Sequence, residues 1–358
     1  TGTLTTDGLT VAGNVSVDSG TIKLDGNYPT GSNNVALGDA ALDDGSLSGA
    51  NNTAIGAAAL TDNTSAGQNT AIGSFAGTNL TTGGLNVAVG QNALFTATTG
   101  TNNVAVGQGS LNALTTASNN TAVGYQSLYS ASTVNGHTAV GHKTLYSNTS
   151  GLLNTAVGYN ALYANTTGDY NVASGYTALT ANTSGEYNTA YGSYALQANT
   201  TASNNTAVGY EAGYTNTTGQ YNTFIGKAAG KVSTSDFNTY IGHDAGLLMT
   251  SGQKNTILGR YNGNQGGLDI RTSDNNIVLS DGDGNPRLFV DSSGRLRFST
   301  CLGQSGGVLN INNIEGSAHC LDLGTETTTN DTLVTFRGST NSDGSGGGVR
   351  GTITVSPS

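Results

Sequence analysis

Asn120-Thr-Ala-Val-Gly124 is one of many near-identical copies of a five-residue motif, and this repeat decides the fold. Fourteen copies occur between residues 34 and 259, and nearly every step between them is 17 residues. Thirteen copies begin with Asn, and His137 begins the remaining one. Clear copies run from Asn52 to Gly56, Asn69 to Gly73, Asn154 to Gly158 and Asn205 to Gly209. Asn276-Ile-Val-Leu-Ser280, 21 residues after the last copy, resembles a worn fifteenth.

The period indicates the kind of repeat. Helical-hairpin repeats need about 33 residues or more, whereas 17 residues suit one coil of a β-solenoid. A second apolar piece follows each motif, as at Ala161-Leu162, and turn residues such as Asn165 to Gly168 separate the units. We therefore expect each coil to contain a strand, a tight corner, a second strand and a loop. Coils stacked at the parallel-strand spacing would form a rod roughly 65 Å long.

Composition narrows the classes of protein. Only 9% of the 358 residues are charged, 6% are aromatic and Trp is absent, which argues against long exposed helices and one thick core. Gly is abundant at 54 residues, but Pro is only 3 and Gly does not recur at every third position, so collagen is excluded. The net charge of −10 argues against non-specific nucleic-acid binding. No apolar run is long enough to span a bilayer.

The motif also predicts how the chain associates. Alternate residues of a strand face opposite sides, so the Ala and the Gly share one side and the residue before the Gly points to the other. That residue is aliphatic in most copies, as in Val89, Val106, Val123, Val140 and Val157. A coil of 17 residues is too slim to bury both sides, and an exposed aliphatic stripe implies a partner surface. The simplest partner is the same chain around a symmetry axis, which predicts a homotrimer.

The repeat resembles the head of YadA-like trimeric autotransporter adhesins, whose motif is Asn-Ser/Thr-Val/Ala-Ala/Val-Ile/Val-Gly. The resemblance covers residues 33–260, although the period of 17 is longer than that of the family. It implies an all-β fold, a left-handed parallel β-roll that assembles as an intertwined homotrimer.

The flanking sequences resemble phage tail fibres instead. Residues 3–17 are similar to β-rich segments of such fibres, and Arg287 to Arg295 is similar to another segment common there. We expect an N-terminal β shaft or connector at 1–32, a β-roll of about fourteen coils at 33–260, and a C-terminal β domain, a cap or tip, at 261–358. The sequence contains neither a heptad stalk nor a membrane-anchor segment, which favours a phage fibre over a bacterial adhesin.

Aromatic residues fall into three columns when the repeats are aligned. They lie one residue after the Gly, five after it and five before it, as in Tyr159, Tyr163 and Tyr170. In a solenoid these columns become ladders along the rod. Such ladders either stack on the sugar rings of a host surface glycan or pack loops and trimer contacts.

Acidic or amide residues precede the third aromatic column. From this pattern the predicted glycan-binding residues are Asp169, Tyr170, Glu186, Tyr187, Tyr221 and Asp236. Asp169 and Glu186 would lie about one strand spacing apart, close to the separation in retaining glycosidases. Both acids, however, follow Gly residues in turns, where acids are ordinary. No catalytic residue is therefore predicted, and the chain is not expected to be an enzyme.

Metal and cofactor signals are weak. Asp281-Gly-Asp283-Gly-Asn285 resembles the start of a calcium loop, but Ser292 occupies the position that requires Glu, so a β-turn is expected. His137, His142, His243 and His319 lack ligand spacing. Cys301 and Cys320 could form a disulfide or remain thiols. We predict no metal site and no cofactor.

Together these patterns predict a receptor-binding fibre of a phage tail, located in the extracellular part of the virion. Its expected partners are two further copies of itself, other tail proteins at one end, and a host surface glycan or outer-membrane receptor, with no nucleic acid. A bacterial trimeric surface adhesin is the first alternative, and a polysaccharide depolymerase tailspike is the second. Ice binding, suggested by Thr121, Thr138 and Thr155, ranks last because paired Thr-x-Thr rows are missing.

Overall fold

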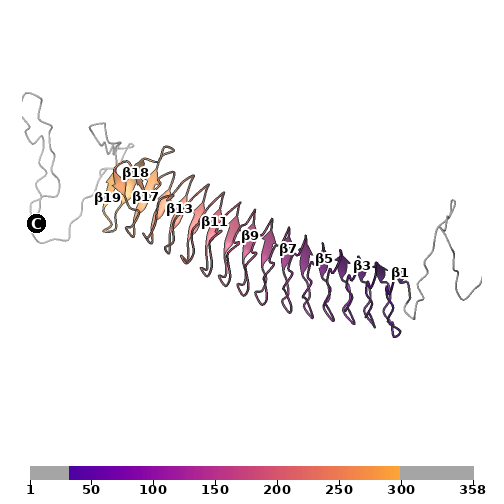
Figure 1. Ribbon diagram of the computed structural model, residues 1–358. Coiled ribbons are helices and arrows are strands. Elements are labelled where there is room, and N and C mark those ends of the chain that lie inside the picture. The colour runs from indigo at the N-terminus through magenta and orange to yellow at the C-terminus, as the bar shows by residue number, and fades with distance from the viewer. Residues whose placement is uncertain (1–31, 299–358) are drawn as a thin grey trace, which may run out of the picture. The chain divides into compact units, whose positions relative to one another are not determined.

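In a computed structural model, which describes residues 32–298, the repeats stack into a rod (Figure 1). All regular elements of this range are β-strands, and no helix that could cross a membrane occurs in it. The prediction of an all-β parallel solenoid of about fourteen coils is confirmed. The predicted connector at 1–32 falls almost wholly outside the described range, as do Cys301, His319 and Cys320.

Each motif copy supplies one strand of three residues. Neighbouring strands pair in parallel and in register, so that Thr121 lies opposite Thr138 and Ala122 opposite Ala139. The repeat length alone sets this register, because equal positions of successive coils meet. The strands are β1 Val35–Leu37, β2 Thr53–Ile55, β3 Thr70–Ile72, β4 Val87–Val89, β5 Val104–Val106, β6 Thr121–Val123, β7 Thr138–Val140, β8 Thr155–Val157, β9 Val172–Ser174, β10 Thr189–Tyr191, β11 Thr206–Val208, β12 Thr223–Ile225, β13 Thr239–Ile241 and β14 Thr256–Leu258.

The interior of the rod is narrow and filled by the chain itself. In the coil of β8, Ala156 at the strand centre and Ala161 and Leu162 after the corner are fully buried. The residue before the Gly points outward, and Val157 is 41% exposed. The predicted division of the strand into an inner Ala side and an outer aliphatic side is therefore confirmed.

The second strand predicted for each coil is wrong. Leu162 and Asn160 have φ values of 52° and 53°, in the left-handed region, and the segment after the corner is a turn. Residues with a left-handed φ alternate with residues of negative φ in this segment, which tilts the peptide groups. The backbone still forms hydrogen bonds between coils: the amide of Leu162 donates to the carbonyl of Ala178 at 3.0 Å. This turn carries Leu into the interior without an extended segment.

The motif Gly is required by the stacking. Gly158 has a φ of 129°, and a Cβ there would meet the carbonyl carbon of Gly175 in the next coil at 2.8 Å. Any side chain at this position would push the coils apart, which explains why Gly closes all fourteen copies.

The Asn that opens each motif joins the coils through its side chain. Asn154 Oδ1 accepts the backbone N–H of Asn171 at 2.8 Å, and its Nδ2 donates to the carbonyl of Gly168 at 2.8 Å. The amide thus satisfies backbone groups that the short strands leave unpaired, and a buried backbone group without a partner would be costly. The same arrangement recurs along the column, which we call the Asn column.

Gly replaces the buried Leu in four coils, and in two of them a larger residue at the strand centre fills the space. Phe224 occupies the strand centre where most coils have Ala, and a Cβ at Gly230 would overlap its ring. Tyr240 and Gly246 form the same combination one coil later. The two rings stack at 5.5 Å between centroids. In these two coils the replacement of Leu by Gly is therefore compensated by the larger residue at the strand centre of the same coil.

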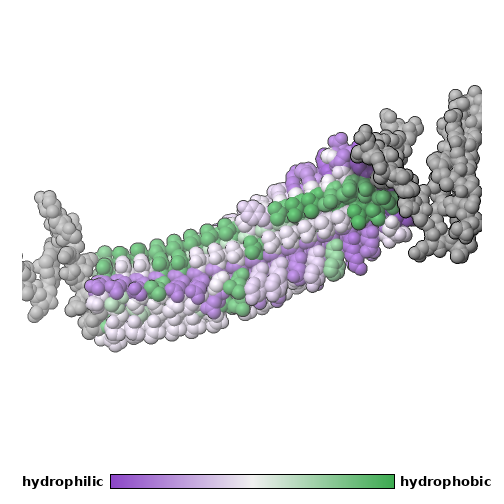
Figure 2. Space-filling view, turned by 180° about the vertical axis from the view of Figure 1, so that it is seen from behind, coloured by the Kyte–Doolittle hydropathy of each residue, from purple (hydrophilic) through white to green (hydrophobic). Residues whose placement is uncertain are grey.

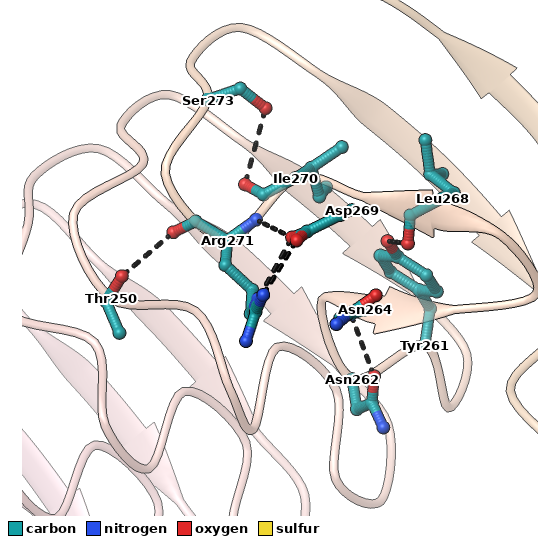
Figure 3. A network of polar contacts seen from close by, with 9 residues as sticks. All are labelled: Thr250, Tyr261, Asn262, Asn264, Leu268, Asp269, Ile270, Arg271 and Ser273. Atoms are coloured by element: carbon teal, nitrogen blue, oxygen red, sulfur yellow. Dashed lines mark hydrogen bonds and ion pairs between the residues drawn. The ribbon is translucent and has the colours of Figure 1, made fainter.

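The sheet continues beyond residue 260 through a longer coil. Strand β17 (Ile277–Ser280) pairs in parallel with β14, with Ile277 opposite Thr256, which confirms the worn fifteenth copy. The extra residues form a small hairpin of β15 (Asn264–Gln265) and β16 (Leu268–Asp269). Figure 3 shows how this hairpin is held: Tyr261 Oη donates to the carbonyl of Leu268 at 2.8 Å, and Thr250 Oγ1 donates to the carbonyl of Arg271 at 3.2 Å.

Two antiparallel strands then follow, β18 (Pro286–Val290) and β19 (Leu296–Phe298). The calcium-like segment is the turn between β17 and β18, as predicted. Its Asp281 carboxylate accepts the backbone N–H groups of Asp283 and Asn285 at 3.1 and 2.8 Å and pairs with Arg287. Asp291 builds the next turn in the same way. Residues 32–298 contain no cluster of three or more metal-ligating side chains.

Candidate functional site

The loops of the middle and later coils carry the predicted glycan-binding residues. We call the positions five residues before each motif Gly the loop column, which runs Leu153, Tyr170, Tyr187, Asn204, Tyr221 and Phe237. All of these have positive φ values, between 54° and 62°. The shared backbone conformation projects the side chains from equivalent points of successive coils, and the four rings are 46–54% exposed.

The rings of the loop column form two stacked pairs. Tyr170 and Tyr187 lie 5.1 Å apart between centroids with planes 4° from parallel, and Tyr221 and Phe237 lie 5.0 Å apart with planes 2° from parallel. In each pair the two rings cover each other's inner faces, so solvent beside the rod meets the ring edges. Ring faces remain available only at the ends of a pair.

The predicted acids differ in their roles. We call the positions directly before the loop column the acid column. Asp169 Oδ1 accepts the backbone N–H of Leu152 at 2.7 Å, and Asp236 Oδ1 accepts that of Gln220 at 2.7 Å. These carboxylates therefore hold the preceding coil, as the Ser203 hydroxyl does for the N–H of Glu186 at 3.0 Å. In the described part of the chain, no hydrogen bond engages the Glu186 carboxylate.

This arrangement bears on the acid pair that the sequence suggested. The Asp169 carboxylate turns toward the coil that precedes it, whereas Glu186 belongs to the coil that follows. The Asp169 carboxylate is thus not directed toward Glu186. The geometry gives them separate roles, one in the fold and one available for contacts.

Two further aromatic ladders run along the rod. After the motif Gly, Tyr125, His142, Tyr159 and Tyr176 stack with centroids 4.8–5.3 Å apart. Five residues after the Gly, Tyr129, Tyr146 and Tyr163 stack at 5.2 Å. Lys143 lies over Tyr125 and Tyr146, 5.9 and 5.4 Å from their centroids, and joins the two ladders by cation–π contact.

Three residues were not predicted from the sequence as members of these exposed columns. His142 continues the first ladder, and its spacing of 17 residues from Tyr125 and Tyr159 was the available signal. Tyr194 crosses between Tyr176 and Tyr210 edge-on from the neighbouring position. Asn204, which interrupts the loop column, is the third.

His137, the histidine that begins one copy of the motif, lies inside the rod. His137 takes the place of an Asn in the Asn column: its Nδ1 accepts the backbone N–H of Asn154 at 3.1 Å, and its Nε2 lies 3.3 Å from Asn148 Nδ2. Burial lowers the pKa of its imidazole. The ring is a structural substitute for an amide.

The long outer column is the other exposed feature. It consists of the residues directly before each motif Gly, and its most exposed aliphatic members include Leu37, Ile72, Val157, Val208 and Leu258, at 36–57%. Figure 2 shows hydrophobic residues in a line along the rod. Ser174 and Tyr191 interrupt the column near its middle.

The chain matches no protein-family model, no curated protein and no solved structure. The site must therefore be interpreted from its own geometry.

Proposed function

We propose that this chain is the receptor-binding segment of a phage tail fibre, which attaches the virion to a polymer on the host cell surface. The observation that carries the proposal is a rod whose interior is already filled, yet which exposes an aliphatic column and repeated aromatic columns along its length. A rigid repeating rod suits attachment at a distance, and no enzymatic turnover is part of the proposal.

A homotrimer is part of the same proposal. The outer column is aliphatic in every coil except those of Ser174 and Tyr191, so a copy of the same rod placed alongside meets a regularly spaced set of aliphatic residues on either side of this interruption. Covering one such residue contributes about 1 kcal/mol, and this contribution recurs along the rod. The left-handed, intertwined arrangement of adhesin heads is the form that the sequence resemblance favours.

Binding to the polymer would be weak at each coil and strong in sum. Three chains present many copies of the loop column, and linked sites gain apparent affinity through a high effective concentration. Exposed tyrosines beside carboxylates and amides suit sugar rings and their hydroxyl groups. The acidic charge of −10 disfavours nucleic acid as the polymer. The other expected partners are tail proteins at one end of the fibre and, in place of a glycan, an outer-membrane protein receptor.

The full chain, fluorescently labelled, should bind bacterial cells from a test panel in a saturable way. Periodate oxidation of the cells should abolish the binding if the receptor is a glycan, whereas protease treatment should abolish it if the receptor is a protein. Binding to no cells would contradict the proposal.

Two further readouts separate the alternative functions. New reducing ends released from a bound polysaccharide would identify a depolymerase. Antibodies to the chain should label virion tails in a phage lysate, and labelling of bacterial surfaces without phage would identify an adhesin.

A further inference from the structure

The gap in the loop column has the dimensions of a ring-binding slot. Tyr187 and Tyr221 face each other across Asn204, one coil from each. The outer faces of the two stacked pairs, which stacking leaves open, are the faces that look into this gap.

The backbone runs through the gap without a break. The amide of Asn204 donates to the carbonyl of Glu186 at 3.0 Å, and the amide of Tyr221 donates to that of Ser203 at 3.3 Å. The φ of Asn204 is 62°, against 56° and 57° for the flanking tyrosines. The two phenol rings are therefore two coil spacings apart, about 10 Å. An asparagine side chain is much shorter than a tyrosine side chain, so Asn204 does not reach the outer part of the space between the two rings.

The width matches one inserted ring. A ring placed midway would lie about 5 Å from each wall, within the range of favourable aromatic contact, and the stacked pairs on either side adopt the same separation of 5.0–5.1 Å. The rest of the slot is polar: the Asn204 amide lies between the walls, with Glu186 and Gln220 in the adjoining acid column. In residues 32–298, no hydrogen bond engages the side chains of these three residues.

We propose that this slot binds a single neutral pyranose ring, with its two faces against Tyr187 and Tyr221 and its hydroxyl groups bonded by Asn204, Glu186 and Gln220. The carboxylate of Glu186 accepts hydroxyl protons and disfavours an acidic sugar. The proposal rests on the attachment function above and names the substrate class and the position in the rod where recognition is strongest. The other two open ring faces of the loop column, those of Tyr170 and Phe237, have no aromatic ring opposite them, because Leu153 and Lys254 occupy the neighbouring positions.

The decisive variant fills the slot without disturbing the fold. Asn204→Tyr continues the stack, because tyrosine already occupies the same left-handed conformation at 170, 187 and 221. Asn119→Tyr is the matched control, since Asn119 also lies in the loop column with a φ of 62°, but between Asn102 and Gly136. Tyr221→Asn removes one wall as an independent test. Circular dichroism should be unchanged in all three.

Saturation-transfer NMR on the full chain, with methyl pyranosides of glucose, galactose, mannose and N-acetylglucosamine as probes, measures the binding. We expect at least one pyranoside to bind, with affinity lowered about tenfold or more by Asn204→Tyr and Tyr221→Asn and unaltered by Asn119→Tyr. Equal binding by wild type and Asn204→Tyr would overturn the slot. So would the absence of transfer to every pyranoside. Cell binding by the wild-type chain in either case would leave the attachment function standing.

Discussion

The early and middle coils fill the same interior position in different ways. Seven residues after the motif Gly, the early coils carry Leu80, Ala97, Leu114 and Ala131. From residue 148 to residue 216 the position is Asn, and these amides form a ladder in which Asn165 donates to Asn148 at 2.8 Å and Asn182 donates to Asn165 at 2.7 Å. The same backbone thus accommodates either apolar or polar residues at this interior position, provided that neighbouring coils carry residues of the same kind.

A buried Asn whose neighbouring coils carry apolar residues at this position shows why neighbouring coils need residues of the same kind. Asn63 lies at this position among the early coils, it is fully buried, and neither its Oδ1 nor its Nδ2 has a hydrogen-bond partner. Asn182 is equally buried but bonds above, below and to the carbonyl of Gly185 at 2.9 Å. The difference teaches that a buried polar residue stabilises a solenoid only as part of a continuous column.

The largest expected effect comes from the coils with an aromatic strand centre. Phe224→Ala should lower the free energy of unfolding by about 3–5 kcal/mol, because Gly213 and Gly230 on either side leave a void that cannot collapse. Adding Gly230→Leu restores the Ala–Leu pair of an ordinary coil and should recover most of the loss. Guanidinium denaturation with hydrogen exchange at β12 and β13 measures both. Gly230→Leu alone should destabilise by overpacking, and a stabilised single variant would contradict this packing.

Replacing Asn182 or Asn63 by Leu compares the contribution of a buried Asn in the polar ladder with that of a buried Asn among apolar neighbours. Asn182→Leu should cost about 1–3 kcal/mol, because the amides of Asn165 and Asn199 lose their partners. Asn63→Leu should stabilise by roughly 1 kcal/mol, because it removes two unsatisfied buried groups and matches Leu80 in the next coil. Denaturation midpoints measure the pair. Equal effects of the same sign would show that column continuity does not matter.

His137 makes the junction between the two interiors sensitive to acid. Burial lowers the pKa of this imidazole in the folded chain, so below about pH 6.5 the unfolded chain binds more protons and folding is weakened. His137→Asn restores the Asn column and should make stability less dependent on pH as pH falls from 7 toward the folded-state pKa. Thermal unfolding across this range compares the two chains. Parallel curves would refute the assignment.

The smallest effect is expected at the exposed ladders. Tyr146→Ser removes the middle ring of a stack of three, and this should cost no more than about 1 kcal/mol, because the rings lie outside the interior and are only partly buried. Thermal unfolding measures the change. A loss comparable to that of Phe224→Ala would mean that the surface ladders, rather than the interior, hold the rod.

The features that follow from the spacing of the repeats could be predicted from the sequence. Seventeen-residue steps fixed the parallel register, the Asn and Gly columns, the outward Val157 and the aromatic ladders. It did not predict the turn conformation at Leu162, because apolar pairs are expected in strands and the left-handed φ of Leu is unusual. The partnership of Phe224 with Gly230 was also missed, since compensation inside one coil requires knowing which positions meet. Nothing in the sequence indicated that Asp169, a predicted glycan-binding residue, also accepts the backbone N–H of Leu152.

The proposal that the outer column is covered by identical chains has one direct test. Multi-angle light scattering of the full chain measures its mass in solution, and the proposal predicts three copies. The triple variant Val106→Asp, Val123→Asp, Val140→Asp should dissociate the three copies with the β-type circular dichroism retained. Gln91→Asp with Gln108→Asp, at exposed positions outside the outer column, should not dissociate them. A well-ordered monomer, or a trimer indifferent to charges in the outer column, would contradict the account.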